Sequence, residues 1–107
     1  MRALEEHAPL DVASPIAWAA LALVRAWERL GDEAYLAAAQ RLGQWIYDQT
    51  YDERGARGYT GGLTEDGTLH PWKATEHNVD VYAAFMGLYR ATGDPAWHER
   101  AMSAKRF

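Results

Sequence analysis

The chain contains no cysteine, which excludes disulfide bonds, thiolate chemistry and cysteine-based zinc sites. It has little basic charge: eleven basic residues against fifteen acidic ones give a formal net charge of −4, and no run of Lys or Arg forms a basic stripe. Contacts to nucleic-acid phosphates need basic side chains, so we expect no nucleic-acid partner.

Long hydrophobic runs are absent as well. The longest, residues 16–24, ends at Arg25, and a membrane span needs about 20 apolar residues. Acidic residues in the first dozen positions argue against a signal peptide. We therefore expect a soluble chain with no membrane partner, with the cytoplasm as the default compartment.

Apolar residues are plentiful: they form 49% of the 107 residues, with five Trp and six Tyr. This is well above the range of disordered chains, and the length suits one domain at most. The chain can therefore bury a core.

The pattern of residues 14–50 predicts a tight helical hairpin. Ser14-Pro15 is a helix start, with a capping hydroxyl before a proline. Gly31 ends that helix and Asp32 caps the next. Apolar residues recur at helical spacing in both helices. The expected inward stripes are Ile16, Ala19, Ala20, Leu23, Val24, Trp27 and Leu30, then Ala34, Tyr35, Ala38, Leu42, Trp45 and Ile46.

Residues 51–72 interrupt the helical rhythm with five glycines and alternating aromatics. Asp66-Gly67 is typical of a hairpin turn, with residues 62–64 and 68–70 as short arms. A loop of this length in a compact domain is usually functional or disordered, and its aromatics favour an ordered one.

A second hairpin is predicted for residues 75–107. Its first helix runs from about Thr75 to Ala91, Gly93 ends it, and Asp94-Pro95 begins a fourth helix. The expected inward stripe of the third helix is Val79, Tyr82, Ala83, Met86 and Tyr89; the fourth helix carries Trp97, Ala101 and Ala104.

The second hairpin repeats the first at an offset of 62 residues. Gly31-Asp32 corresponds to Gly93-Asp94, and Trp27 to Tyr89. Repeated helical hairpins indicate a stacked or ring-like array, because one unit cannot bury its faces alone. The expected fold is all-α, two antiparallel hairpins joined by a long Gly/Tyr-rich loop, and we expect this chain to be part of a larger array.

Polar residues concentrate in the stretch from Trp72 to Asp80. Glu76 and Asp80 are four residues apart, which places them on one helical face with Cβ atoms about 5–6 Å apart. A carboxylate in a first turn also favours the helix dipole, so Glu76 has a structural interpretation beside a catalytic one. A glycosidase pair flanks the scissile bond, whereas these two acids approach from one side.

If Glu76 is a general acid, its partner therefore comes from the loop or from outside the chain. The candidates in the loop are Asp52, Glu53, Glu65 and Asp66. Asp80 is the second catalytic candidate, as a group that orients or tunes its neighbours.

Two histidines lie near these acids, His70 and His77, but their spacing matches no strong metal motif. A hydrogen-bonded or substrate-binding role is the stronger interpretation of His77, and we expect neither a metal nor another cofactor. Tyr59, Trp72 and Tyr82 could stack on a sugar ring. The helical spacing of the other tryptophans indicates packing instead: Trp18, Trp27, Trp45 and Trp97.

Paired helices with Gly-Asp turns, a Gly/Tyr-rich insertion, and Trp-Lys-Ala-Thr-Glu-His-Asn-Val-Asp opening a helix together resemble the six-hairpin glycosidase superfamily. Its members are (α/α)6 toroids and include glycoside hydrolases, polysaccharide lyases and the N-acylglucosamine 2-epimerase group. The resemblance covers residues 14–107, and only the stretch from Glu76 to Asp80 is distinctive. A toroid has about twelve helices, and this chain offers four.

The resemblance implies that residues 51–72 and the turn from Thr75 to Asp80 lie at the mouth of a central cavity. It implies a carbohydrate substrate and acid/base hydrolysis of a glycosidic bond in a full-length parent. Glu76 and Asp80 would be the catalytic residues; the substrate-binding residues would be Tyr59, Trp72, His77 and Asn78. The expected macromolecular partner is the remainder of the toroid, or another copy of the chain.

Two other interpretations remain open. One is a non-catalytic helical-repeat module that binds a glycan or a peptide in the same cleft. The other is a buried polar network that pins the loop to the helix, in which case each polar group should find a protein partner. Exposure of Glu76 and Asp80 separates a site from a network.

Overall fold

The computed structural model describes residues 13–52, 58–59 and 75–106. The fold is all-α, as predicted. Helix α2 (Ala13–Leu30) and helix α3 (Glu33–Thr50) form one hairpin, and α4 (Thr75–Thr92) and α5 (Pro95–Arg106) form the other. Two short strands, β1 (Tyr51–Asp52) and β2 (Gly58–Tyr59), lie between the hairpins in sequence.

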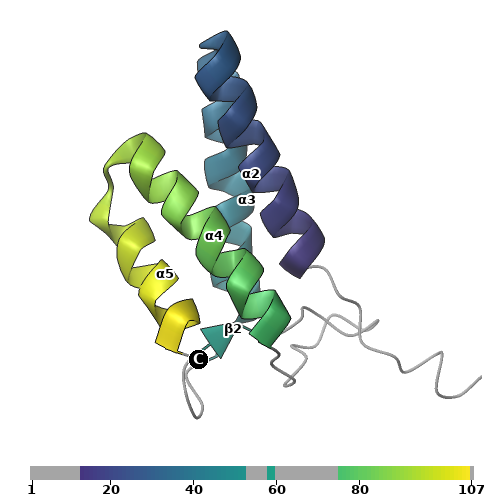
Figure 1. The fold of residues 1–107 in the computed structure, drawn as a ribbon, viewed down its shortest axis with the longest axis vertical. Helices are drawn as coiled ribbons and strands as arrows, with labels where there is room; N and C mark the ends of the chain where they lie inside the picture. The colour runs from purple at the N-terminus through teal and green to yellow at the C-terminus, as the bar shows by residue number, and fades with distance from the viewer. Residues whose placement is uncertain (1–12, 53–57, 60–74, 107) are drawn as a thin grey trace, which may run out of the picture.

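Figure 1 shows that α2 and α4 run in the same direction and lie side by side, while α3 and α5 return in the opposite direction. The two hairpins are therefore stacked in parallel. Helix α4 contacts α3 as well as α2, and Gln44 links α3 to α5 by accepting a hydrogen bond from Arg100 at 2.9 Å. None of the helices in the described ranges is long and apolar enough to cross a bilayer.

The turns of the two hairpins have the same geometry, which confirms the repeat. Gly31 and Gly93 adopt φ of 75° and 73°, a left-handed conformation that glycine adopts without steric cost. Their N–H groups donate to Trp27 O and Tyr89 O at 2.8 and 2.7 Å, which satisfies a carbonyl at each helix end.

The helix starts that follow these turns match as well. Asp32 Oδ1 accepts from the N–H of Ala34 at 2.9 Å, and Asp94 Oδ1 accepts from that of Ala96 at 3.0 Å. Both are N-caps of the kind the sequence predicts. Helix α2 begins at Ala13, one residue before Ser14, a difference of the size by which helix boundaries ordinarily vary.

The core lies between the hairpins and differs in part from the predicted stripes. Helix α2 buries Ala13, Ala17, Ala20 and Val24, and α3 buries Leu36, Ala39, Gly43, Ile46 and Thr50. The predicted stripes share Ala20, Val24 and Ile46 with this core; Ala19, Leu30 and Ala34, predicted with them, are exposed. The prediction for α5 is confirmed, because Trp97, Ala101 and Ala104 are buried.

The stripe predicted for α4 is on the wrong face. The helix buries Val81, Ala84, Phe85 and Leu88, whereas Val79 is 58% exposed and Tyr82 and Met86 are half-buried. Apolar residues lie all round this helix, so periodicity alone does not select the face that packs. Contacts with α2, α3, α5 and β2 select it instead.

The strands form a small antiparallel ladder in which Tyr51 pairs with Tyr59 and Asp52 with Gly58. The sequence did not predict this ladder. The hairpin that it predicts at Asp66-Gly67 is a different feature and lies outside the described residues. The ladder begins directly after α3 and brings β2 against α4 and α5 (Figure 1).

Candidate functional site

Four of the six predicted site residues lie at the start of α4: Glu76, His77, Asn78 and Asp80. Glu76 and His77 belong to the first turn of this helix, whose first residue is Thr75, and the N-terminal end of a helix favours a carboxylate. The spacing of Glu76 and Asp80 predicts that they share one helical face, but the side chain of Glu76 lies outside the part of the chain that the structure describes. Trp72 lies outside the described residues.

Asp80 is half-buried and makes no hydrogen bond or ion pair with any residue that the structure describes. Its neighbour Val79 is exposed. Within that part of the chain, Asp80 therefore lacks the partners that a closed polar network would give it, and its carboxylate can accept hydrogen bonds from a ligand.

Asn78 has a different environment, because its side chain is buried against β2 with only 2% exposed. Its Oδ1 accepts from the N–H of Tyr59 at 2.8 Å, and its Nδ2 donates to the carbonyl of Tyr59 at 2.9 Å. One amide thus satisfies both backbone groups of Tyr59, which are buried and need partners. This pair of bonds anchors β2 to α4, and it is the pinning role that the network interpretation predicts for Asn78.

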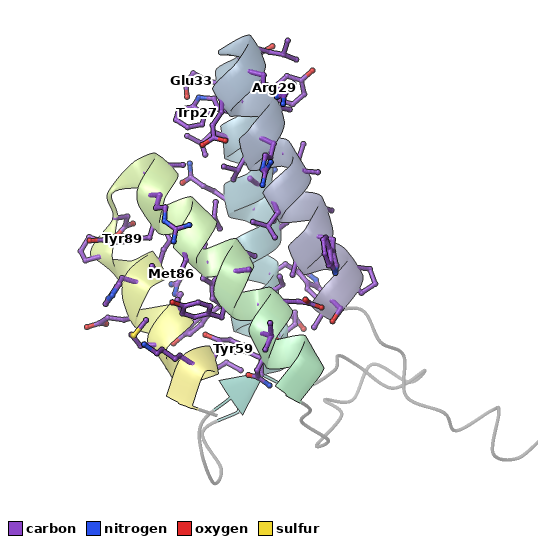
Figure 2. All side chains as sticks on the ribbon, viewed as in Figure 1. Trp27, Arg29, Glu33, Tyr59, Met86 and Tyr89 are labelled. Carbon is purple, nitrogen blue, oxygen red and sulfur yellow. The ribbon has the colours of Figure 1, made fainter. Side chains whose placement is uncertain are left out.

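The side chain of Tyr59 completes this anchor. It is fully buried (Figure 2), its hydroxyl donates to the carbonyl of Arg100 at 3.0 Å, and its ring meets Phe85 edge-on with centroids 5.4 Å apart. Burial raises the pKa of the Tyr59 phenol well above its ordinary 10.0, and the neighbouring Tyr47 and Tyr51 raise it further. The ring therefore packs inside the domain and is not available to stack on a sugar.

We expect the stability conferred by Tyr59 to be lost at alkaline pH. Because its folded-state pKa lies above the unfolded value, the unfolded state loses its proton first, and stability falls by up to about 1.4 kcal/mol per pH unit above pH 10. Tyr59→Phe should cost about 1 kcal/mol at neutral pH through the lost hydrogen bond, and this deficit should shrink above pH 10. Urea unfolding from pH 7 to 11 measures the difference; a constant gap would contradict the assignment.

Trp18 is another aromatic residue that the sequence placed wrongly. The prediction has it packed, as Trp97 is, but it is 63% exposed. Trp18 is the sixth residue of α2 and Asp80 the sixth residue of α4, so the two occupy equivalent positions in the repeat. The N-terminal ends of α2 and α4 point toward the same end of the molecule (Figure 1). The sequence signal that could have revealed the position of Trp18 is the 62-residue repeat, which makes Trp18 equivalent to Asp80, a candidate site residue.

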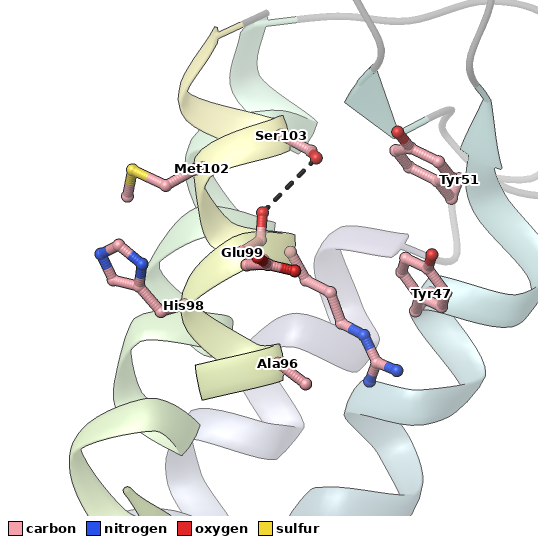
Figure 3. A pocket seen from close by; sticks show the side chains of 8 residues that line it. Tyr47, Tyr51, Ala96, His98, Glu99, Met102 and Ser103 are labelled. Atoms are coloured by element: carbon pink, nitrogen blue, oxygen red, sulfur yellow. Dashed lines mark hydrogen bonds between the residues drawn. The ribbon is translucent and has the colours of Figure 1, made fainter. Parts of the chain in front are cut away.

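A separate groove of about 620 Å³ lies between α5 and the C-terminal end of α3 (Figure 3). Tyr47 and Tyr51 form one wall, with their rings stacked at 5.2 Å. Arg100 lies over the Tyr47 ring at 4.2 Å and over the Trp97 ring at 4.8 Å, a cation–π arrangement that holds its guanidinium in place. The lining residues are Tyr47, Tyr51, Ala96, His98, Glu99, Arg100, Met102 and Ser103.

Among the described residues, no three His, Asp, Glu or Cys side chains gather in a group that could hold a metal ion. His70 lies outside those residues, and the side chain of His77 does too. Comparison with models of protein families, with curated proteins and with solved structures gives no match.

Proposed function

We propose that this chain is a two-hairpin part of a carbohydrate-active α/α-toroid protein of the six-hairpin glycosidase kind. In this proposal α2 and α4 are inner helices, and their N-terminal ends carry the sugar site. The full-length parent would hydrolyse a glycosidic bond by acid/base catalysis.

The observation that carries the proposal is the equivalence of Trp18 and Asp80 on parallel, adjacent helices. An exposed indole offers an apolar face to the CH groups of a sugar ring, and the Asp80 carboxylate at the equivalent position of α4 can accept hydrogen bonds from hydroxyls. The first turn of α4 adds Glu76 and His77 at the same end. Asn78 supports the site by anchoring β2 rather than by meeting the sugar.

Glu76 is the proposed general acid or base, because it lies one turn before Asp80 on the same face of the helix. Asp80 would orient the substrate and tune Glu76. The second catalytic carboxylate must approach from the opposite side of the bond, so in this proposal it comes from residues 51–72 or from the remainder of the toroid.

Replacing Glu76 by glutamine in the full-length parent tests the catalytic role. We expect hydrolysis to fall by a factor of about 10²–10⁴, the usual contribution of a general acid, with the far-ultraviolet circular dichroism and melting temperature unchanged. Glu99→Gln removes the same charge from an exposed position on α5 and should leave hydrolysis intact. Hydrolysis at the wild-type rate in Glu76→Gln would refute the role.

A non-catalytic module that binds a glycan or a peptide is the second candidate, and the groove between α3 and α5 favours it. Tyr47 and Tyr51 give this groove an aromatic wall, and Arg100 and Glu99 supply charges of both signs. Such a mixture of aromatic and convergent polar groups is typical of ligand sites. Tyr51→Ala would weaken binding in this case, whereas Trp18→Ala would not.

A further inference from the structure

Among the residues that the structure describes, the two stacked hairpins leave one face uncovered at each end of the pair. Since the hairpins repeat at an offset of 62, each residue of α4 has an equivalent on α2, and the equivalent residues can be compared in burial. Each helix leaves wholly or partly exposed a face whose equivalent the other helix buries.

Helix α4 buries Val81, Ala84 and Leu88, at 0%, 1% and 0% exposed. Their equivalents on α2 are three alanines, Ala19, Ala22 and Ala26; the first two are exposed and the third is half-buried. These three residues are called the α2 outer face below. This face is apolar although most of it is open to solvent.

Helix α2 in turn buries Ala17, Ala20 and Val24, at 0%, 0% and 5% exposed. Their equivalents on α4 are Val79, Tyr82 and Met86, of which the first is 58% exposed and the others are half-buried. These three residues are called the α4 outer face; Met86 is labelled in Figure 2. This face is also apolar.

The side chains of the two outer faces differ in size from their buried equivalents, and they do so in opposite directions. Each side chain of the α4 outer face is larger than its buried equivalent on α2, and the alanines of the α2 outer face are no larger than their buried equivalents on α4. Pairing the two faces therefore sets large side chains against small ones. Contacts of this kind let two helices interdigitate.

We propose that the chain binds a second copy of itself head to tail, with the α4 outer face of one copy packed against the α2 outer face of the next. The contact would continue the interface that α2 and α4 already form within one copy. Tyr82 and Met86 of one copy would lie against the alanines of the other.

A head-to-tail contact is heterologous: the two surfaces differ, so each copy keeps one free face for another partner. Association should therefore grow beyond a dimer, either to a closed ring or to an open chain. The proposal rests on the internal repeat and not on the carbohydrate site, so either proposal can fail without the other.

Sedimentation velocity of the whole chain over a range of concentrations tests association. We expect the average mass to rise above the 12.0 kDa of one chain as concentration increases. Ala22→Lys on α2 and Val79→Lys on α4 each place a charge on one exposed position. Each should weaken the association of chains about 30-fold or more, the size of a hot-spot loss. Ala37→Lys makes the same substitution as Ala22→Lys at an exposed position of α3 and should associate as the wild type does.

Mixing the two variants tests the head-to-tail arrangement itself. Ala22→Lys retains a good α4 outer face and Val79→Lys a good α2 outer face, so the mixture should form 1:1 complexes that stop at two chains. Circular dichroism of each variant checks that it is folded. A wild-type chain that stays monomeric at every concentration, or a mixture that forms no complex, would overturn the proposal; so would a single variant that associates as well as Ala37→Lys.

Discussion

Replacing Asn78 by alanine should lower the free energy of unfolding by about 2–4 kcal/mol. The substitution leaves the buried N–H and carbonyl of Tyr59 without the partners they now have at 2.8 and 2.9 Å, and each unsatisfied buried group costs about 1–3 kcal/mol. Urea unfolding followed by circular dichroism measures the loss. Loss of hydrogen-exchange protection at the amide of Tyr59 would locate it.

The neighbouring Val79→Ala is the matched control, because Val79 lies in the same turn of α4 but is largely exposed. At a protein concentration at which the chain is monomeric, this substitution should change stability by less than about 0.5 kcal/mol. An equal loss of unfolding free energy in both variants would show that Asn78 stabilises α4 itself rather than the anchor to β2.

Asn78→Asp gives the anchor a pH test. An ionised carboxylate cannot donate to the Tyr59 carbonyl, whereas a protonated carboxyl both donates and accepts, as the amide does. Burial raises the folded-state pKa of the introduced group above the unfolded value, so its stabilising contribution is present at low pH and lost as pH rises. We therefore expect the gap between variant and wild type to narrow as pH falls toward 4.

Replacing Gly43 by alanine should lower the free energy of unfolding by about 1–2 kcal/mol, although alanine is the better helix former by about 1 kcal/mol. A Cβ at this position would lie 2.5 Å from Leu88 Cδ1 and 3.0 Å from two ring carbons of Trp97. Both neighbours are buried and cannot move into solvent, so the added methyl overpacks the contact of α3 with α4 and α5.

Gly87→Ala is the control for Gly43→Ala, since Gly87 is also a helical glycine at a contact between helices. Its Cβ would meet only Leu21 Cδ2 at 3.2 Å, and Leu21 is half-buried and can adjust. The gain in helix propensity should then prevail, with stability unchanged or higher by up to about 1 kcal/mol. Thermal unfolding of both variants should separate them by several degrees; equal effects would contradict the tight contact at Gly43.

The helices and their turns could be predicted from the sequence because local chemistry determines them. Gly31 and Gly93 adopt the left-handed conformation that glycine allows, and Asp32 and Asp94 cap the helices that follow. These signals depend on a few adjacent residues, so no knowledge of the fold is needed to read them.

The packing faces of α2 and α4 could not be predicted in the same way. Both helices are apolar over more than one stripe, so the buried stripe depends on which neighbours are present. Val79 belongs to a predicted inward stripe and is exposed, while Trp18 has the spacing of a packed residue and lies in solvent. Both belong to surfaces that a second hairpin or a ligand would cover in the proposals above.

The role of Asn78 also could not be predicted without the fold. Its position between acids and a histidine suggested a ligand-binding amide, but its partner Tyr59 is nineteen residues away and lies in β2, which pairs with β1. A two-residue ladder of this kind leaves almost no periodic signal in a sequence.

The most direct test of the carbohydrate site is a titration of the isotopically labelled chain with neutral oligosaccharides built on glucose, mannose and N-acetylglucosamine, followed by backbone amide shifts. We expect the shifts to cluster at Trp18, Glu76 and Asp80, and to vanish in Trp18→Ala but not in Leu30→Ala, which truncates an equally exposed side chain at the far end of α2. Shifts confined to Tyr47, Tyr51 and Glu99, or no shifts with any of these sugars, would contradict a sugar site at the N-terminal ends of α2 and α4.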